Sequence, residues 1–314
     1  MSLAERVLAG DVRAAARLMR DIDDRMPSAV QELKSLHPHT GRAYILGLTG
    51  PPGAGKSTLV DQMIEAYRKR GLRVGVVAVD PTSPYTGGAI LGDRVRMNRH
   101  AEDPGVFIRS LATRGALGGL SRSTMDVVNV MDAMGMDVVL VETVGVGQDE
   151  IDIAGSAHST VVVMVPGLGD DIQAIKAGIL EIGDLFVVNK ADRDGAERTV
   201  RELRSMLEMR HPAPEAWQPR VLKTEAFRGV GVEELVQELE AHRAFLSQTD
   251  TLRRVIEERN ARVFGETLKE ELYAMVLQGL IESGAYNELM QRLHSRATDP
   301  YSAVEEVMAR TSFT

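Results

Sequence analysis

Short apolar runs recur along the middle of the chain and alternate with segments whose apolar residues have helical spacing. After the run at 43–48 come six more: RVGVVAV (73–79), GVFIRS (105–110), DVVLVE (137–142), STVVVMV (159–165), DLFVVN (184–189) and PRVLK (219–223). Helices are predicted between them, over 57–70, 121–134, 170–180, 194–209 and 231–246. Near-continuous apolar strands that alternate with helices predict an α/β fold with a mostly parallel sheet, covered by helices on both faces.

Both ends of the chain are predicted to be helical. Apolar residues recur at helical spacing over 3–36, and Pro27 marks the start of a second helix there. From Thr249 onward strand patterns stop, and one apolar stripe contains Phe264, Leu268, Leu272, Met275, Val276 and Leu280. A helical segment of this length does not close a core alone, so the stripe must pack on the sheet domain or on another subunit.

The composition limits the classes of function. The 314 residues carry a formal net charge of −8 and no cysteine, which argues against nucleic-acid binding and excludes thiol catalysis and Cys-based metal sites. No apolar run approaches the roughly 18 residues of a membrane helix, and the N-terminus lacks the apolar region of a signal peptide. We therefore expect a cytoplasmic protein with no membrane partner.

The stretch GLTGPPGAGKSTLV (47–60) contains the pattern G-x-x-x-x-G-K-[ST] between a predicted strand and a predicted helix. Backbone N–H groups of such a loop, together with a helix N-terminus, form a nest for phosphate oxygens. Lys56 is expected to reach the β- and γ-phosphates, and the Ser57 hydroxyl to coordinate Mg²⁺. The predicted phosphate-binding residues of this loop are Gly53, Ala54, Gly55, Lys56, Ser57 and Thr58.

The stretch FVVNKAD places Asn189, Lys190 and Asp192 at the end of an apolar strand, in the N-K-x-D pattern of GTP-binding proteins. A carboxylate can accept from both N1–H and the exocyclic amine of guanine, whereas adenine offers no such pair. The Lys190 stem can lie over the base. We therefore predict GTP and GDP as ligands, with a loop that contains Glu225 and Ala226 closing over the base.

A further strand ends in ETVGVGQ, where Glu142 takes the place of the usual magnesium-holding aspartate. Gly145 is expected to sense the γ-phosphate and Gln148 to position water. The alternative is that the acids just beyond, Asp149 and Glu150, only favour the start of a helix.

Asp80 and Asp93 lie in a long loop rich in Gly, Pro, Ser and Thr. Loops of this length are commonly functional, and two acids there suit a Mg²⁺ shell. The alternative for Asp80 is an ordinary Asp-Pro turn. The predicted metal ligands are Ser57, Asp80, Asp93 and Glu142.

The ordered set GPPGAGKST, VDPTSP, GDRVRM, ETVGVGQ and NKAD, followed by a helical tail, resembles the G-protein chaperone family of adenosylcobalamin-dependent methylmalonyl-CoA mutase. Its bacterial relatives were once described as arginine/ornithine transport-system kinases. The resemblance covers about residues 3–310. It implies that Asp80 and Asp93 join the Mg-nucleotide shell, that Lys176 relays between nucleotide and partner, and that the C-terminal helices hold a homodimer. Glu225 departs from the small residues common in the base-closing loop.

We accordingly expect an N-terminal helical extension (1–40), a GTP-binding P-loop domain (41–248) and a C-terminal helical dimerisation segment (249–314). The expected function is that of a slow GTPase switch, stimulated by an acyl-CoA mutase whose cofactor loading or reactivation it controls. One alternative is a small-molecule kinase, for which Arg109, Arg114 and Arg122 would form a lid. Another is a nickel-delivery GTPase, for which the chain has few metal-relay ligands.

Replacing Asp192 by Asn tests the assignment of the base. The substitution presents a donor where guanine needs an acceptor, so GTP affinity should fall roughly 10- to 150-fold, the equivalent of about 1.5–3 kcal/mol. Affinity for XTP should rise, because xanthine carries a carbonyl at the position of the 2-amine. Competition binding of GTP, XTP and ATP to both proteins measures this, and an unchanged GTP preference would remove Asp192 from the base site.

Overall fold

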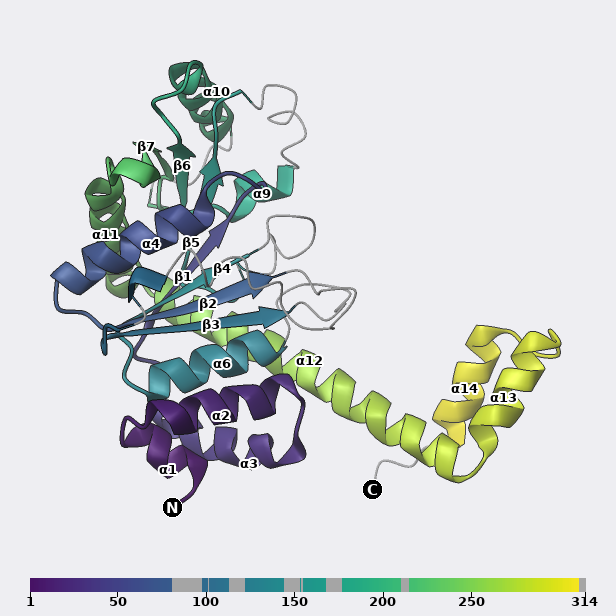
Figure 1. Ribbon diagram of the computed structural model, residues 1–314. Helices are drawn as coiled ribbons and strands as arrows, with labels where there is room; N and C mark the ends of the chain where they lie inside the picture. The colour runs from purple at the N-terminus through teal and green to yellow at the C-terminus, as the bar shows by residue number, and fades with distance from the viewer. Residues whose placement is uncertain are drawn as a thin grey trace. The chain divides into compact units, whose positions relative to one another are not determined.

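The computed structural model describes residues 1–80, 98–100, 102–112, 122–143, 153, 155–167, 177–209 and 215–310 (Figure 1). They fall into two compact units, Met1–Arg259 and Asn260–Thr314, which we describe separately.

One sheet of seven parallel strands forms the centre of the first unit. The strands are β1 (Tyr44–Thr49), β2 (Val74–Asp80), β3 (Val106–Ala112), β4 (Val138–Glu142), β5 (Ser159–Met164), β6 (Leu185–Asn189) and β7 (Arg220–Thr224). Their order is β3-β2-β4-β1-β5-β6-β7, so β1 lies in the middle between β4 and β5. The register pairs Leu46 of β1 with Leu140 of β4 and with Ser159 of β5. The predicted fold class is confirmed.

The helices of the first unit are α1 (Leu3–Leu8), α2 (Val12–Asp23), α3 (Pro27–Leu36), α4 (Lys56–Lys69), α6 (Arg122–Ala133), α9 (Ala177–Ile182), α10 (Ala196–Glu208) and α11 (Val232–Gln248). Short 3-10 helices are η1 (His37–His39), η2 (Asn98–His100) and η3 (Ala226–Arg228). Helix α12 (Thr251–Glu282) begins in this unit and ends in the second one.

Alternate residues of the strands face two separate cores. Tyr44, Leu46 and Leu48 of β1 pack with α4 and α11, whereas Ile45 packs with α6 and with α1–α3. Helix α10 covers the latter face farther along, over β5 and β6. Burial on both faces explains why the strands contain nearly continuous Val, Leu and Ile, because each side chain meets a helix.

The N-terminal region has one more break than its apolar spacing indicates. Helix α1 ends at Leu8, and Gly10 takes a left-handed backbone with φ of 83°. The Asp11 carboxylate then accepts from the backbone N–H groups of Arg13 and Ala14, at 2.9 and 3.1 Å, and begins α2. This N-cap lies within the helical spacing, which is why periodicity alone overlooks it.

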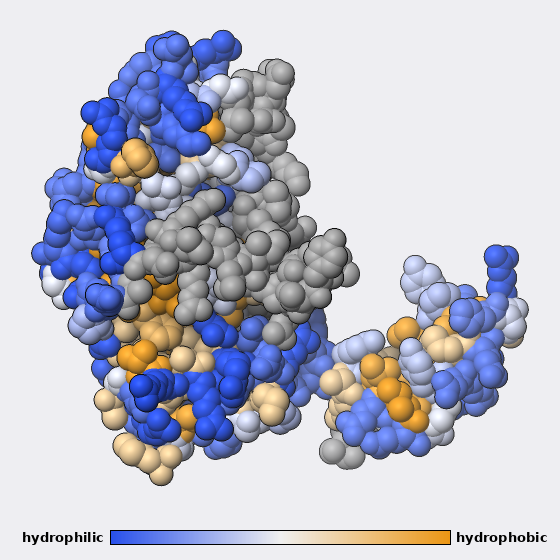
Figure 2. Space-filling view, viewed as in Figure 1, coloured by the Kyte–Doolittle hydropathy of each residue, from blue (hydrophilic) through white to orange (hydrophobic). Residues whose placement is uncertain are grey.

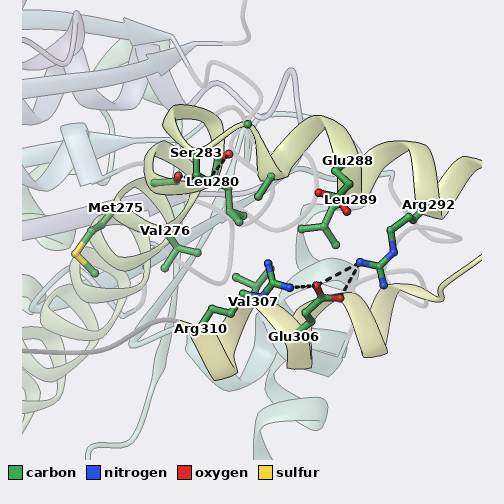
Figure 3. A pocket seen from close by; sticks show the side chains of 13 residues that line it. Met275, Val276, Leu280, Ser283, Glu288, Leu289, Arg292, Glu306, Val307 and Arg310 are labelled. Atoms are coloured by element: carbon green, nitrogen blue, oxygen red, sulfur yellow. Dashed lines mark hydrogen bonds and ion pairs between the residues drawn. The ribbon is translucent and has the colours of Figure 1, made fainter.

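The second unit contains the end of α12 with α13 (Ala285–His294) and α14 (Pro300–Arg310). Figure 2 shows orange, hydrophobic atoms on the surface of this unit. Its exposed large apolar side chains include Phe264, Tyr273, Met275, Ile281, Tyr301 and Val304. A 710 Å³ groove lies among the three helices (Figure 3). Its apolar wall includes Val276, Leu280 and Leu289, and Glu306 bridges Arg292 and Arg310 along one side. No described helix combines the length and apolar composition needed to cross a membrane.

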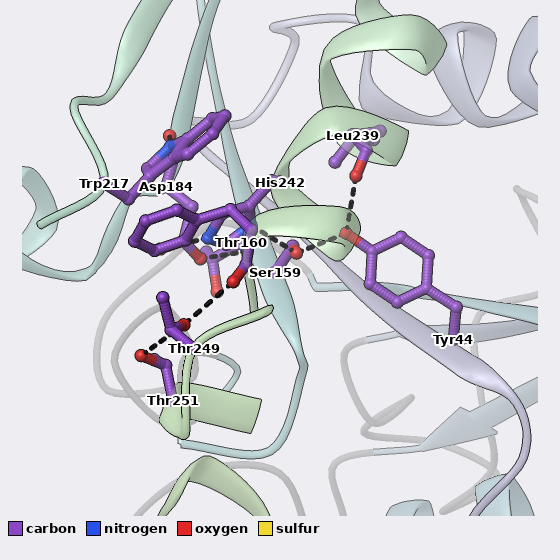
Figure 4. Close-up of polar contacts among 10 residues, drawn as sticks. Tyr44, Ser159, Thr160, Asp184, Trp217, Leu239, His242, Thr249 and Thr251 are labelled. Atoms are coloured by element: carbon purple, nitrogen blue, oxygen red, sulfur yellow. Dashed lines mark hydrogen bonds and ion pairs between the residues drawn. The ribbon is translucent and has the colours of Figure 1, made fainter. Parts of the chain in front are cut away.

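A polar cluster is buried at the amino end of the central strands (Figure 4). The hydroxyl of Tyr44 donates to the carbonyl of Leu239 at 3.0 Å and also contacts Ser159 Oγ. Ser159 Oγ lies 2.6 Å from Nδ1 of His242, whose ring packs 4.6 Å from that of Trp217. The cluster joins β1, β5 and α11. Nearby, the carboxylate of Asp184 accepts from the backbone N–H of Thr160 at 2.8 Å.

Burial favours the neutral form of two histidines near the amino end of the strands, His242 and His158. Burial lowers the pKa of His242 to about 4. Burial, followed by the charges of Arg259 and Arg243, lowers the pKa of His158 to about 3. Since both values lie below the ordinary 6.5, the unfolded chain binds more protons than the folded one in the interval between.

Stability of the protein should therefore fall as the pH drops from about 6.5 towards 4, and be fully regained above that window. Each histidine should contribute roughly 2 kcal/mol to the loss between about pH 7 and about pH 5. Urea unfolding followed by fluorescence of Trp217, the single tryptophan, measures it. His242→Gln should flatten the pH dependence, whereas exposed His39→Gln should leave it unchanged. Equal slopes for both variants would contradict this account.

Candidate functional site

The glycine-rich loop connects β1 to α4 at the carboxyl end of the central strand. Gly50 has φ of 134°, and a Cβ on it would lie 2.1 Å from the carbonyl oxygen of Val163 in β5. Gly55 has φ of 87°, and a Cβ there would lie 2.5 Å from Nδ2 of Asn189. Both positions require glycine, because the backbone turns left-handed in close contact with a neighbouring loop or strand.

Lys56 and Ser57 begin α4, and both are buried. The Lys56 ammonium group donates to the carbonyl oxygens of Gly50 and Pro51, at 2.7 and 3.2 Å. It thus lies against the loop that precedes its own helix. The N-terminus of α4 adds the partial positive charge of unbonded N–H groups, so the loop, the helix end and the ammonium group together favour a phosphate.

Glu142 ends β4 beside β1, where it pairs in register with Leu48. The Ser57 hydroxyl donates to Oε1 of Glu142 at 2.7 Å, and the carboxylate is only 3% exposed. The next residue, Thr143, fixes this strand end, since its N–H donates to the Leu48 carbonyl at 3.0 Å. The start of α4 and the end of β4 thereby bring a hydroxyl and a carboxylate together next to the phosphate loop.

Asn189 ends β6 and contacts two loops with its buried amide. Nδ2 donates to the carbonyl of Ala54 in the glycine-rich loop at 2.8 Å. Oδ1 accepts from the Thr224 hydroxyl and from the N–H of Ala226, both at 3.0 Å. Lys190, with a left-handed φ of 56°, donates from its ammonium group to the carbonyl of Gly53 at 2.7 Å. The N-K-x-D segment is thus joined to the phosphate loop.

The remaining residues predicted for the base site follow β6 and β7, at the carboxyl end of the same sheet. Asp192 lies in the turn after β6 and is exposed, so a ligand can reach its carboxylate. Glu225, where small residues are common in the resembled family, forms an ion pair with Arg228 at 2.9 Å. Phe227 follows Ala226 in η3 and is 92% exposed, a feature that the sequence analysis did not identify.

Several predicted residues cannot be placed at the site. The side chain of Asp80, at the end of β2, is not described, and Asp93, Gly145, Gln148 and Lys176 lie outside the described residues. Of the arginines considered for a kinase lid, Arg109 lies in β3, 3.9 Å from Asp23, Arg122 begins α6, and Arg114 is outside the described residues. Within the described part of the chain, no group of three His, Asp or Glu side chains gathers as a metal-binding cluster.

This geometry defines the class: a P-loop nucleotide-binding protein with the phosphate loop on the central strand of a parallel sheet. The chain belongs to the family described as methylmalonyl Co-A mutase-associated GTPase MeaB, whose model matches residues 15–280. The protein is therefore a GTPase that binds guanine nucleotide, and the family resemblance seen in the sequence is confirmed.

Similar proteins agree with this assignment. A protein of Pyrococcus abyssi whose name assigns it to the GTPases is 48% identical over 310 residues, which cover 98% of this chain and 95% of the relative. The GTPase ArgK of Escherichia coli is 35% identical, over 85% of this chain and 83% of its own. The mitochondrial methylmalonic aciduria type A homolog of Mus musculus is 40% identical over 61% of this chain and 47% of its own.

A solved structure with the same fold is the crystal structure of an LAO/AO transport system kinase. It superposes with a TM-score of 0.73 at 26% sequence identity, covering 98% of this chain and 95% of that one.

Proposed function

We propose that this GTPase is a switch protein that serves as a chaperone for an adenosylcobalamin-dependent acyl-CoA mutase of the methylmalonyl-CoA mutase type. In this role, bound nucleotide controls cofactor loading or the protection and reactivation of the mutase. The observation that supports it is the match of residues 15–280 to a family named for association with that mutase. The Mus musculus relative, named for methylmalonic aciduria, supports the same partner.

The residues near the phosphate loop fit a bound Mg²⁺. Ser57 and Glu142 present a hydroxyl and a carboxylate oxygen 2.7 Å apart, and oxygen donors of this kind are those that Mg²⁺ prefers. Few protein ligands suffice, since in nucleotide sites phosphate and water complete the shell. We propose Ser57 and Glu142 as ligands here, with Asp80 and Asp93 as further members. Bound Mg²⁺ would neutralise charge on the phosphates.

The chain's own residues would position the nucleotide. The ammonium group of Lys56, now donating to loop carbonyls, would turn to the β- and γ-phosphates. Asn189 and Lys190 would keep the base loop in register with the phosphate loop, and Asp192 would accept from guanine. We assign sensing of the γ-phosphate to Gly145, water positioning to Gln148 and relay to the partner to Lys176.

The motifs identify no arginine for the transition state of phosphoryl transfer, so we expect slow intrinsic turnover that the partner raises. Hydrolysis should increase at least about tenfold, the equivalent of about 1.4 kcal/mol in the barrier, on addition of a purified adenosylcobalamin-dependent acyl-CoA mutase. Phosphate release with and without the mutase measures this. Lys56→Ala is the hydrolysis control, and a CoA enzyme without cobalamin is the partner control. If no adenosylcobalamin-dependent acyl-CoA mutase bound the protein or stimulated its GTP hydrolysis, the proposed role would be overturned.

We further propose that the protein is a homodimer held by its C-terminal helices. Helix α12 has no buried residue, and Phe264, Leu268 and Met275 are 68, 44 and 52% exposed. An apolar stripe of this extent on a monomer is characteristic of an interaction surface.

Introducing charge into the stripe should dissociate the dimer. Phe264→Glu combined with Leu268→Glu places two carboxylates in an apolar contact, and the dimer dissociation constant should rise at least about 100-fold, or about 2.7 kcal/mol. Light scattering over a concentration series measures it. Phe227→Glu, at an exposed phenylalanine of the other unit, is the matched control. A monomeric wild type, or an unaltered dimer in the double variant, would contradict the proposal.

A further inference from the structure

Two threonine side chains meet at the carboxyl ends of β1 and β4, where the glycine-rich loop begins. Thr49 is the last residue of β1, and Thr143 is the first residue after β4. The hydroxyl of Thr143 donates to the hydroxyl oxygen of Thr49 at 3.1 Å and also lies 3.4 Å from the carbonyl oxygen of Leu48. We call Thr49 and Thr143 the threonine pair.

The threonine pair is buried, with exposed fractions of 0% for Thr49 and 1% for Thr143. The nearby strand residues Leu48 and Val141 are apolar members of the core. Two valines would fill nearly the same space as the pair, and replacing both partners of a hydrogen bond by apolar groups of the same shape can be nearly neutral for stability. Packing alone therefore does not require these two hydroxyl groups.

The pair extends the pairing of β1 with β4, which lie side by side in Figure 1. Leu48 is opposite Glu142 in the register of the two strands, and the N–H of Thr143 donates to the Leu48 carbonyl at 3.0 Å. The hydroxyl contact with Thr49 adds a second bond, one residue farther along β1. Because hydrogen bonds are directional, two bonds to adjacent residues fix the orientation of the strand end better than one.

On the side of β1, the pair adjoins the start of the glycine-rich loop. Thr49 is followed by Gly50, whose carbonyl oxygen accepts from the ammonium group of Lys56 at 2.7 Å. Gly50 has little freedom to move, because its left-handed backbone lies in close contact with Val163. Thr49 is thus joined to a rigid part of the phosphate loop, which makes it a firm support for Thr143.

On the side of β4, the pair adjoins the carboxylate next to the phosphate loop. Thr143 follows Glu142, whose Oε1 accepts from the Ser57 hydroxyl at 2.7 Å. Two oxygen ligands at neighbouring corners of a Mg²⁺ octahedron lie about 3 Å apart, since each Mg–O distance is about 2.0–2.1 Å. The two oxygens are close to this separation already, and a displaced end of β4 would change it.

We propose that Thr143 is a positioning residue for GTP hydrolysis. Through its hydroxyl contact with Thr49, it holds the carboxylate of Glu142 at the distance from Ser57 at which both oxygens can serve one Mg²⁺. Its own hydroxyl is directed to β1 and not to a ligand. The inference rests on the proposed metal role of Ser57 and Glu142, and it extends that role to a residue buried between the strands.

The test is the dependence of the GTPase rate on free Mg²⁺. Thr143→Val keeps the shape of the side chain and the backbone N–H but removes the donated hydroxyl. We expect the Mg²⁺ concentration for half-maximal rate to rise about tenfold, the equivalent of about 1.4 kcal/mol. The rate at saturating Mg²⁺ and the affinity for GDP in EDTA should change less than about threefold. Thr143→Ser, which retains the hydroxyl, should have the Mg²⁺ dependence of the wild type.

Further variants separate positioning from stability. Thr49→Val removes the acceptor and should shift the Mg²⁺ dependence in the same direction. The double valine variant should show no more than the larger single shift, because both changes break one contact. It also keeps the test valid if a single valine, which leaves a buried hydroxyl without its partner, does not fold. Thr199→Val, at a buried threonine of α10, is the matched control and should leave the Mg²⁺ dependence unchanged.

Urea unfolding of each variant measures stability separately. A lower urea midpoint with the Mg²⁺ dependence of the wild type in the valine variants of the pair would overturn the proposal and leave the pair a structural role only.

Glu142→Gln distinguishes failure of this inference from failure of the metal assignment. If Glu142→Gln raises the Mg²⁺ requirement and Thr143→Val does not, the metal assignment stands and the positioning role is removed. If Glu142→Gln leaves the Mg²⁺ dependence unchanged, Glu142 is removed from the metal shell and the inference fails with it. Phosphate release by the wild type tests the GTPase activity independently of both.

Discussion

The side chain of Asn189 imposes the constraint on which the nucleotide site depends. Its amide donates to the phosphate loop at Ala54 and accepts from Thr224 and Ala226 of the loop predicted to close over the base. These segments are far apart in sequence and meet only because β1, β5, β6 and β7 are neighbours in a parallel sheet. Leaving a buried amide unbonded costs about 1–3 kcal/mol per group, so a loop that moves away from Asn189 is penalised. One amide thus holds the phosphate loop and the loop after β7 together.

The carboxyl and amino ends of the sheet carry different sets of polar contacts. At the carboxyl end, Ser57 in the first turn of α4 and Glu142 at the end of β4 lie beside the glycine-rich loop. At the amino end, Ser159 bonds to both Tyr44 and His242 in a buried cluster. Buried hydroxyl groups therefore occur at both ends of the sheet. At the carboxyl end they adjoin the glycine-rich loop, and at the amino end they bond α11 to the strands.

The two units differ in how completely each buries its own apolar side chains. The first encloses its Val and Leu strands between α4 and α11 on one face and α6, α10 and the N-terminal helices on the other. In the second, α12 leaves Phe264 and its neighbours in solvent. This contrast is the physical basis for proposing a second copy of the chain as the partner of that surface.

The sequence by itself determined the strands, the phosphate loop and the family. Runs of Val, Leu and Ile define buried parallel strands, because both faces of each strand must be apolar, and the spacing of Gly50, Gly55, Lys56 and Ser57 fits a loop with few backbone solutions. Periodicity did not find the break at Gly10, since a capping carboxylate overrides local spacing.

Only the tertiary structure decided which polar residues act together. It brought Ser57 to Glu142, across 85 residues, and Asn189 to Ala54, across 135. It also paired Asp61 of α4, only 13% exposed, with Arg99 and His100, although the sequence presents Asp61 as one charged residue of an amphipathic helix. Partners of such groups are set by which strands become neighbours and which helix face is buried, and neither is encoded in local spacing.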